Sequence, residues 1–165
     1  SSLSIDGSSN INAFTCEVKE YLRADTLWGM LDGHSKKYAF TSNSQLILDV
    51  RSFDCKHKYI TADFRKMLRY EEYPSLRIRF LTMEEIRGGA IVKGQVLVEL
   101  AGRKKVMEII YQCEQLTPGQ LRLTGVRKMS FLDFGLEPPK KIGGLIRIRE
   151  EIDVRFDLYF QKLHS

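Results

Sequence analysis

The chain has 165 residues, 43% of them hydrophobic, and its 26 basic and 21 acidic side chains give a formal net charge of +5. This length suffices for one domain with a sizeable core, and no break in composition marks a second, so we expect a single domain over residues 1–165. No run reaches the roughly 20 consecutive apolar residues of a membrane-spanning helix, so no transmembrane segment is expected, and the small basic excess favours anionic partners only weakly.

Three segments in the first half of the chain alternate apolar and polar residues with a period of two. This period is typical of a strand with one buried face, and it predicts strands near residues 12–18, 46–51 and 76–80. Their apolar faces consist of Phe14, Cys16, Val18, Leu46, Leu48, Val50, Leu76, Ile78 and Phe80.

Residues 61–70 break this period. Phe64, Met67 and Leu68 recur at the spacing of one helical face, with basic residues on the other face. We therefore predict a short helix that has Thr61 as its N-cap and ends before Pro74.

The second half of the chain returns to the strand pattern. Residues 92–99 alternate, Gly102 to Lys105 is expected to turn, and residues 106–112 complete a hairpin. A further strand begins at Leu121, and the last alternating run is the longest in the sequence. Its apolar face consists of Ile146, Ile148, Ile152, Val154, Phe156, Leu158 and Phe160.

A rigid corner, Ser-Phe-Leu-Asp-Phe-Gly-Leu-Glu-Pro-Pro at residues 130–139, separates the last two strands. Asp133 and Gly135 suit a tight turn, while Pro138 and Pro139 exclude a helix there. About eight antiparallel strands with one inserted helix would leave exposed edges unless the sheet closes. We therefore expect an all-β fold and favour a closed barrel over a sandwich.

Several segments resemble the YceI-like family, whose members are lipocalin-like, eight-stranded antiparallel barrels that hold a polyprenyl or other long-chain lipid in an elongated interior. The similar segments are Leu3-Ser4-Ile5-Asp6-Gly7, Val50-Arg51-Ser52-Phe53-Asp54, Leu68-Arg69-Tyr70-Glu71-Glu72-Tyr73-Pro74, Gly94 to Val98, Gly102-Arg103-Lys104-Lys105-Val106 and Asp133-Phe134-Gly135-Leu136-Glu137-Pro138-Pro139. The chain is most similar to the branch with the Asp-Phe-Gly-x-x-Pro-Pro corner. The resemblance implies a lipid-binding barrel, and we expect it in the periplasm or cell exterior. The chain begins Ser-Ser without a methionine, which we expect either from a removed targeting peptide or from a chosen sequence boundary.

The candidate ligand-binding residues are the inward-facing apolar side chains of the strands, a group on or beside the helix, and a group at the corner. They are Phe14, Val18, Leu46, Leu48, Val50, Phe53, Phe64, Met67, Leu68, Leu76, Ile78, Phe80, Phe134, Leu136, Ile148, Val154, Phe156 and Leu158. Two interpretations stay open, a lipid-filled tunnel and a solid core that needs no ligand.

The ends of the barrel carry their own alternatives. The helix group is either a lid over one end or a satellite cluster under the helix. The corner group, which includes Phe131, either gates a mouth or plugs it. A second candidate rim is Tyr21, Trp28 and Leu31, in a segment expected to be irregular.

No catalytic, metal or cofactor site is expected. The three histidines, His34, His57 and His164, are scattered, and none forms a recognisable nucleophile motif with a Ser, Cys or Asp. The three cysteines, Cys16, Cys55 and Cys113, match no zinc spacing and allow at most one internal disulfide. A bridge between Cys16 and Cys55 is one possible pairing and requires an oxidising compartment.

Basic side chains are spread over the predicted strands and turns. They include Arg65, Lys66, Arg69, Arg77, Arg79, Arg103, Lys104, Lys105, Arg127, Lys128, Lys140, Lys141, Arg147 and Arg149. Aromatic residues do not interleave with them as in a base-stacking platform, so we expect no nucleic-acid partner and place most of them on outer faces or in turns. Arg103 to Lys105 and the pair Lys140 and Lys141 are candidates to contact an anionic lipid headgroup, which includes peripheral contact with a membrane.

The sequence thus predicts a non-enzymatic protein that binds, transports or sequesters an amphiphilic long-chain lipid, polyprenyl or fatty-acid-like. The alternative is a ligand-free interaction module of the cell envelope that binds a partner through its basic outer surface.

Overall fold

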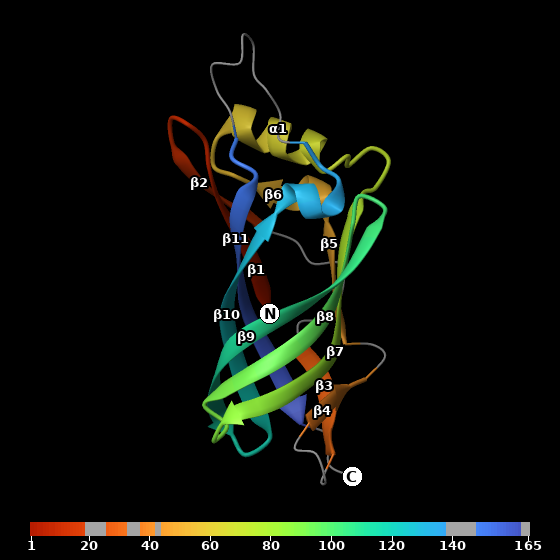
Figure 1. Ribbon diagram of the computed structural model, residues 1–165, viewed down its shortest axis with the longest axis vertical. Helices are drawn as coiled ribbons and strands as arrows, with labels where there is room; N and C mark the ends of the chain where they lie inside the picture. Colours follow the sequence, from red (N-terminus) through yellow and green to blue (C-terminus); the bar gives the residue numbers. More distant parts are fainter. Residues whose placement is uncertain (19–25, 33–36, 42–43, 138–147, 163–165) are drawn as a thin grey trace.

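The computed structural model describes residues 1–18, 26–32, 37–41, 44–137 and 148–162 (Figure 1). These residues form eleven strands, one α-helix and two 3-10 helices. The strands are β1 (Ser2–Ser8), β2 (Ala13–Val18), β3 (Thr26–Asp32), β4 (Lys37–Phe40), β5 (Gln45–Asp49), β6 (Phe53–Asp54), β7 (Ser75–Arg87), β8 (Ile91–Leu100), β9 (Arg103–Thr117), β10 (Gln120–Ser130) and β11 (Glu151–Lys162). The helices are α1 (Lys58–Met67), η1 (Val50–Ser52) and η2 (Phe131–Phe134).

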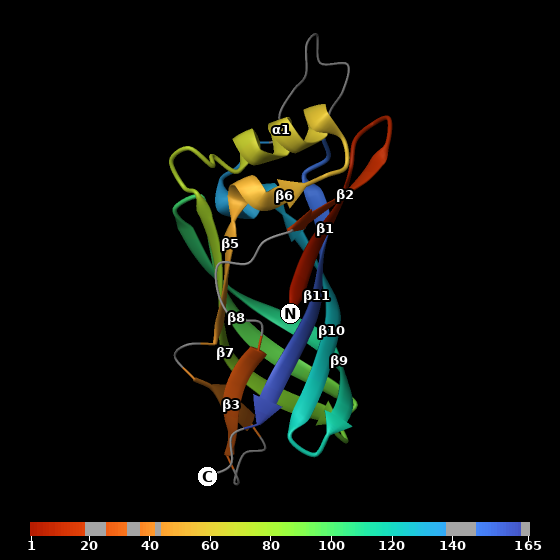
Figure 2. The ribbon, with the colours of Figure 1, turned by 180° about the vertical axis from the view of Figure 1, so that it is seen from behind.

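Strand β11 closes the sheet into a ring. It pairs with β10 from Glu151 to Gln161, and from β10 the order runs through β9, β8, β7, β4 and β3 back to β11. The other edge of β11 pairs with β1 in its first half and with β3 in its second half (Figure 2). The expected all-β, lipocalin-like barrel with one α-helix is confirmed.

The sheet differs from the expectation in three ways. It contains eleven strands in the described residues where about eight were expected, because β1, the β3–β4 hairpin and the two-residue β6 lie in segments where no strand was predicted. Strand β3 runs parallel to β11, so the ring is not wholly antiparallel. The longest strand is β9, with 15 residues, and β11 has 12. Apolar residues occupy both faces of β9, which hides its alternation.

Helix α1 begins earlier than predicted. Its N-cap is His57, whose Nδ1 accepts a hydrogen bond from the Ile60 backbone at 3.3 Å. The expected cap, Thr61, lies inside the helix, because its hydroxyl accepts a hydrogen bond from the Cys55 backbone at 2.9 Å instead. Among the described helices, none has both the length and the apolar character needed to cross a membrane.

The corner after β10 contains a one-turn 3-10 helix, where a tight turn without a helix was expected. The Ser130 side chain accepts from the Leu132 backbone at 3.2 Å, and Asp133 accepts from the Ser130 backbone at 3.3 Å. Gly135 then ends η2 at a φ of 66°, which is the positive φ that the sequence predicted for this glycine. Pro138 and Pro139 lie outside the described residues.

Aromatic side chains fill both ends of the barrel. Opposite the α1 end, Phe160 packs edge-on against Tyr38 and Phe40, with ring centroids 5.5 and 5.2 Å apart. At the α1 end, Phe64 packs on Phe53 at 5.3 Å and on Phe131 at 6.2 Å. We call Phe53, Phe64 and Phe131 the aromatic cap.

A disulfide joins Cys16 of β2 to Cys55, two residues before the N-cap of α1. This is the pairing that the sequence left as one possibility. Cys113 is free and half-buried.

The disulfide should contribute substantially to stability, because it closes a loop with a sequence separation of 39 residues in the unfolded chain. Replacing both residues (Cys16→Ala with Cys55→Ala) should lower the free energy of unfolding by roughly 3 to 4 kcal/mol, as measured by guanidinium titration. Cys113→Ala, which leaves the bridge intact, is the control. Equal stability of the double variant and the wild type would contradict this expectation.

A bidentate ion pair between β10 and β11 should make stability depend on pH. Arg122 donates to the two oxygens of Asp157 at 2.9 and 2.7 Å, and these bonds lower the pKa of that carboxyl group. Because the pKa is lower in the folded state, the stabilisation exists above the unfolded-state pKa of about 3.9 and is lost as pH falls through the folded-state pKa.

Asp157→Asn should therefore flatten the fall in Tm between about pH 4 and pH 2. Asp153→Asn removes a neighbouring carboxylate that lies 4.0 Å from Lys128 and serves as the matched control. An unchanged pH profile for Asp157→Asn would assign the acid sensitivity to other groups.

Candidate functional site

An apolar cavity with a volume of about 40 Å³ lies inside the barrel, lined at one end by η2 and by Leu68, the C-cap of α1. Six of the predicted ligand-binding residues line it: Leu68, Leu76, Ile78, Phe134, Val154 and Phe156. Its walls also contain apolar residues that were not among the predicted ones: Leu3, Ile5, Val98, Leu100, Met129 and Ile152. Strand alternation could have found most of these, since they share a face with predicted neighbours.

The remaining predicted residues are buried but do not line this cavity. They are Phe14, Val18, Leu46, Leu48, Val50, Phe53, Phe64, Met67, Phe80, Leu136, Ile148 and Leu158. The structure thus gathers all eighteen predicted residues into one apolar core, and only a third of them at the cavity.

The helix group and the corner group meet over the same end of the barrel. Figure 1 shows α1 lying across this end with η2 beneath it. The aromatic cap joins the two, because Phe64 of α1 contacts Phe131 of η2. Phe131 and Phe134 of η2 also line the cavity, so η2 forms its roof and Phe64 packs on that roof through Phe131.

The second candidate rim is only partly described. Trp28 lies on β3 with 43% of its surface exposed, on the face opposite to the buried Leu27. Its backbone is fixed by Ser44, whose hydroxyl donates to the Trp28 carbonyl at 2.7 Å and accepts from its N–H at 3.0 Å. Tyr21 lies outside the described residues.

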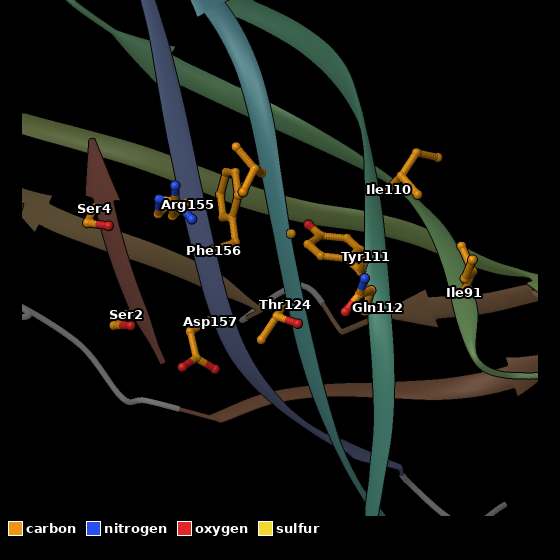
Figure 3. A pocket seen from close by; sticks show the side chains of 12 residues that line it. Ser2, Ser4, Ile91, Ile110, Tyr111, Gln112, Thr124, Arg155, Phe156 and Asp157 are labelled. Atoms are coloured by element: carbon orange, nitrogen blue, oxygen red, sulfur yellow. The ribbon is translucent and has the colours of Figure 1, made fainter. Parts of the chain in front are cut away.

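A second hollow opens on the outer surface where β9 and β10 separate. The two strands pair from Gln120 to Thr124 of β10, and in the described residues no pairing continues beyond Thr124. We call the facing edges Arg103–Tyr111 of β9 and Gly125–Ser130 of β10 the seam. The hollow at its start has a volume of about 630 Å³ (Figure 3).

Gly125 marks the point where the strands part. A Cβ at this position would come within 2.7 Å of the Ile110 carbonyl oxygen and 3.2 Å of the Tyr111 ring, so only glycine allows this close approach. Tyr111 and Phe156, which belong to the buried core, are also among the residues lining the hollow. Phe156 lines the inner cavity as well.

Arg127 lies on the inner face of the sheet, where the sequence placed it on an outer face or in a turn. It pairs with Val154, a buried cavity residue, and directly paired residues of antiparallel strands point to the same face. The strand period would have given this result. Leu121, Leu123 and Met129 are buried on one face, and Arg127 has the same period of two along the strand.

Two residues of the predicted basic turn, Arg103 to Lys105, already contact η2 or the residue that ends it. Lys105 lies 3.3 Å from Asp133 of η2, and the Arg103 guanidinium packs on Gly135. Lys140 and Lys141 lie outside the described residues.

The described residues contain no group of three or more His, Cys, Asp or Glu side chains that could hold a metal ion. His57 serves as the N-cap of α1, and His34 and His164 lie outside the described residues. Burial raises the pKa of the Cys113 thiol, which disfavours the reactive thiolate.

Comparison of the sequence with protein-family models and with curated proteins finds no match. Solved structures do match in three dimensions. BcnA of Burkholderia cenocepacia aligns over 96% of this chain and 94% of its own, with a TM-score of 0.73 and 14% identity.

A polyisoprenoid-binding domain from Saccharophagus degradans aligns over 96% of this chain and 91% of its own, with a TM-score of 0.67 and 14% identity. The YceI protein of Campylobacter jejuni covers 90% of this chain and 85% of its own, with a TM-score of 0.63 and 12% identity. Identities this low establish the fold alone. The chain has the fold of the YceI-like proteins, as its sequence resemblance implied.

Proposed function

We propose that the protein binds an amphiphilic long-chain lipid, polyprenyl or fatty-acid-like, inside the barrel by hydrophobic burial and without chemistry. The cavity beneath the aromatic cap carries this proposal, since among the described residues that line it Ser130 alone has no apolar side chain. A domain of the same fold is a polyisoprenoid-binding domain, which supports a lipid as the ligand. Burial of an alkyl or prenyl chain against such a largely apolar wall lowers the free energy by about 0.8 kcal/mol for each CH₂ group.

The cavity has to enlarge for such a ligand. Its volume of about 40 Å³ compares with the roughly 300 to 1,000 Å³ of ordinary ligand pockets. The part best suited to move is η2 with α1 packed on it, because both are short and neither belongs to the closed ring of strands. Lipid entry therefore requires displacement of the cap aromatics, Phe64 and Phe131, from each other.

The disulfide supports a proposal for the compartment. A Cys16–Cys55 bond persists in an oxidising environment, which supports a periplasmic or extracellular location. Peripheral contact with a membrane would suit a protein that exchanges lipid with it.

A ligand-free interaction module is the second candidate, and the small size of the cavity favours it. Its partner would bind the outer surface, where Arg51, Arg65, Lys66 and Arg69 line a hollow of about 710 Å³ beside α1. Two of these cations are already paired, Arg51 with Asp49 at 3.1 Å and Arg69 with Glu72 at 2.6 Å. The net positive charge of this hollow is therefore small.

Native mass spectrometry and organic extraction of the purified protein separate the two candidates. Lipid binding predicts a co-purified amphiphile, or uptake of one added long-chain lipid per chain after delipidation. A protein that neither carries nor takes up a lipid would refute the proposal and leave the interaction module.

A cavity-filling substitution locates the site. Val98→Phe projects a ring into the cavity and should weaken lipid binding at least tenfold in a calorimetric titration, because the ligand must displace this ring. Val92→Phe is the matched control, since Val92 is equally buried on the inner face of β8 but does not line the cavity. Equal losses in the two variants would mean that the lipid does not occupy this cavity.

A further inference from the structure

The seam holds an arginine, Arg127, whose hydrogen-bonding capacity is only partly used. The Nε atom of Arg127 is buried and has no hydrogen-bond partner among the described residues, and Nη1 donates to the Lys128 carbonyl at 3.0 Å. Buried donors in proteins are nearly always paired. Arg127 is half-buried and its Nη1 bond is exposed, so it is the buried Nε, on the inner face of an apolar barrel, that points to a ligand that supplies an acceptor.

Tyr111 adds a second unpaired donor beside the first. Its side chain is 1% exposed, and its hydroxyl has no partner in the part of the chain that the structure describes. The ring lies against Gly125, and Arg127 is the next inward-facing position on β10, about 6 to 7 Å further along the strand. Burial raises the pKa of this hydroxyl, so it stays protonated and remains a donor.

Tyr111 lies at the boundary between water and the apolar interior, and the half-buried Arg127 follows it along the seam. On the outside, Tyr111 and Phe156 line the hollow of Figure 3, in which the Tyr111 ring is directed towards Phe156. On the inside, Phe156 lines the cavity, as does Met129, the inward neighbour of Arg127. An amphiphile whose chain fills the cavity would place its headgroup at this boundary.

Four carboxylates on or beside the seam strands lie close to other cations. Glu108 lies 3.9 Å from Lys93, Asp133 lies 3.3 Å from Lys105, and Asp153 lies 4.0 Å from Lys128. Asp157 holds Arg122 at 2.7 Å. None of these four carboxylates forms a salt bridge with Arg127. The charge of Arg127 is therefore available to a bound anion.

We propose that the seam binds the anionic headgroup of the lipid, a carboxylate or a phosphate, through charge-assisted hydrogen bonds from Arg127 and a hydrogen bond from the Tyr111 hydroxyl. This inference rests on the proposed function and narrows its ligand class from amphiphiles in general to anionic ones. Neutral lipids of the same chain would bind in the cavity but offer these donors only an uncharged acceptor, which forms weaker hydrogen bonds than an anion.

The test compares matched acidic and neutral ligands on delipidated protein by calorimetric titration. The pairs are palmitate with hexadecanol, and farnesyl phosphate with farnesol. The wild type should bind the anion of at least one pair roughly tenfold or more tightly than its alcohol. The pair that shows the larger ratio identifies the carboxylate or the phosphate as the natural headgroup chemistry.

Arg127→Gln should bring this ratio close to one while binding of the alcohol is retained, and Tyr111→Phe should reduce it by a smaller factor. Lys128→Gln removes the same charge from the outer face of the same strand and should preserve the ratio. Arg127→Lys, which restores the charge without the guanidinium fork, should recover part of it.

The outcomes separate the two proposals. Equal binding of anion and alcohol by the wild type, or an unchanged ratio in Arg127→Gln, would overturn the headgroup site while lipid binding stands. A loss of both ligands by the same factor in Arg127→Gln leaves the ratio unchanged and would likewise overturn it. Binding of neither ligand by the wild type would overturn the headgroup site together with the proposed function.

Discussion

The two-sided pairing of β11 is the constraint on which the rest of the barrel depends. One edge of this strand is paired with β10 over its whole length, and the other edge is divided between β1 and β3. Without β11 the sheet would be open, with a free β10 edge on one side and free β1 and β3 edges on the other. Unpaired backbone groups of that length are a template for aggregation, so closure protects the molecule as well as shaping it.

Closure also decides which side chains are buried. Once the sheet forms a ring, every second residue of each strand faces the interior, and burial of each large apolar side chain contributes about 1.5 to 3 kcal/mol. This explains why strand alternation located the core so well. Leu46, Leu48, Ile78 and Leu158 were placed inside from the sequence, and each is at most 2% exposed in the structure.

The features that sequence could not predict depend on contacts between distant segments. Strand β3 exists because β11 offers it an edge, and Gly29 lies against Phe160 of that strand. No local pattern marks such a strand. The start of α1 was misplaced for a related reason, since the hydroxyl of Thr61 is taken by the Cys55 backbone and His57 takes over the capping role.

Arg127 is a different kind of error, because the local signal was present. Its position follows from the period of its own strand, but an arginine is expected on the wet face of a sheet. Side-chain chemistry and periodicity disagreed at this residue. Such disagreement between levels is typical of functional sites, where a residue is retained at a cost to local consistency.

The filled interior sets the terms on which a lipid can bind. The apolar surface that stabilises the closed barrel is the same surface that a lipid would cover, so the gain on binding is the difference between two buried states. Displaced cap residues must find new apolar contacts, and the acyl or prenyl chain is what supplies them.

Chain burial alone is then a weak discriminator between ligands of similar length. Polar atoms that stay unpaired in the closed barrel, such as the Arg127 Nε and the Tyr111 hydroxyl, are satisfied only in the complex. Because the closed barrel has no hydrogen bonds at these atoms to lose, their pairing with a ligand adds to the affinity of the complex. Selectivity between lipids is therefore concentrated at the headgroup.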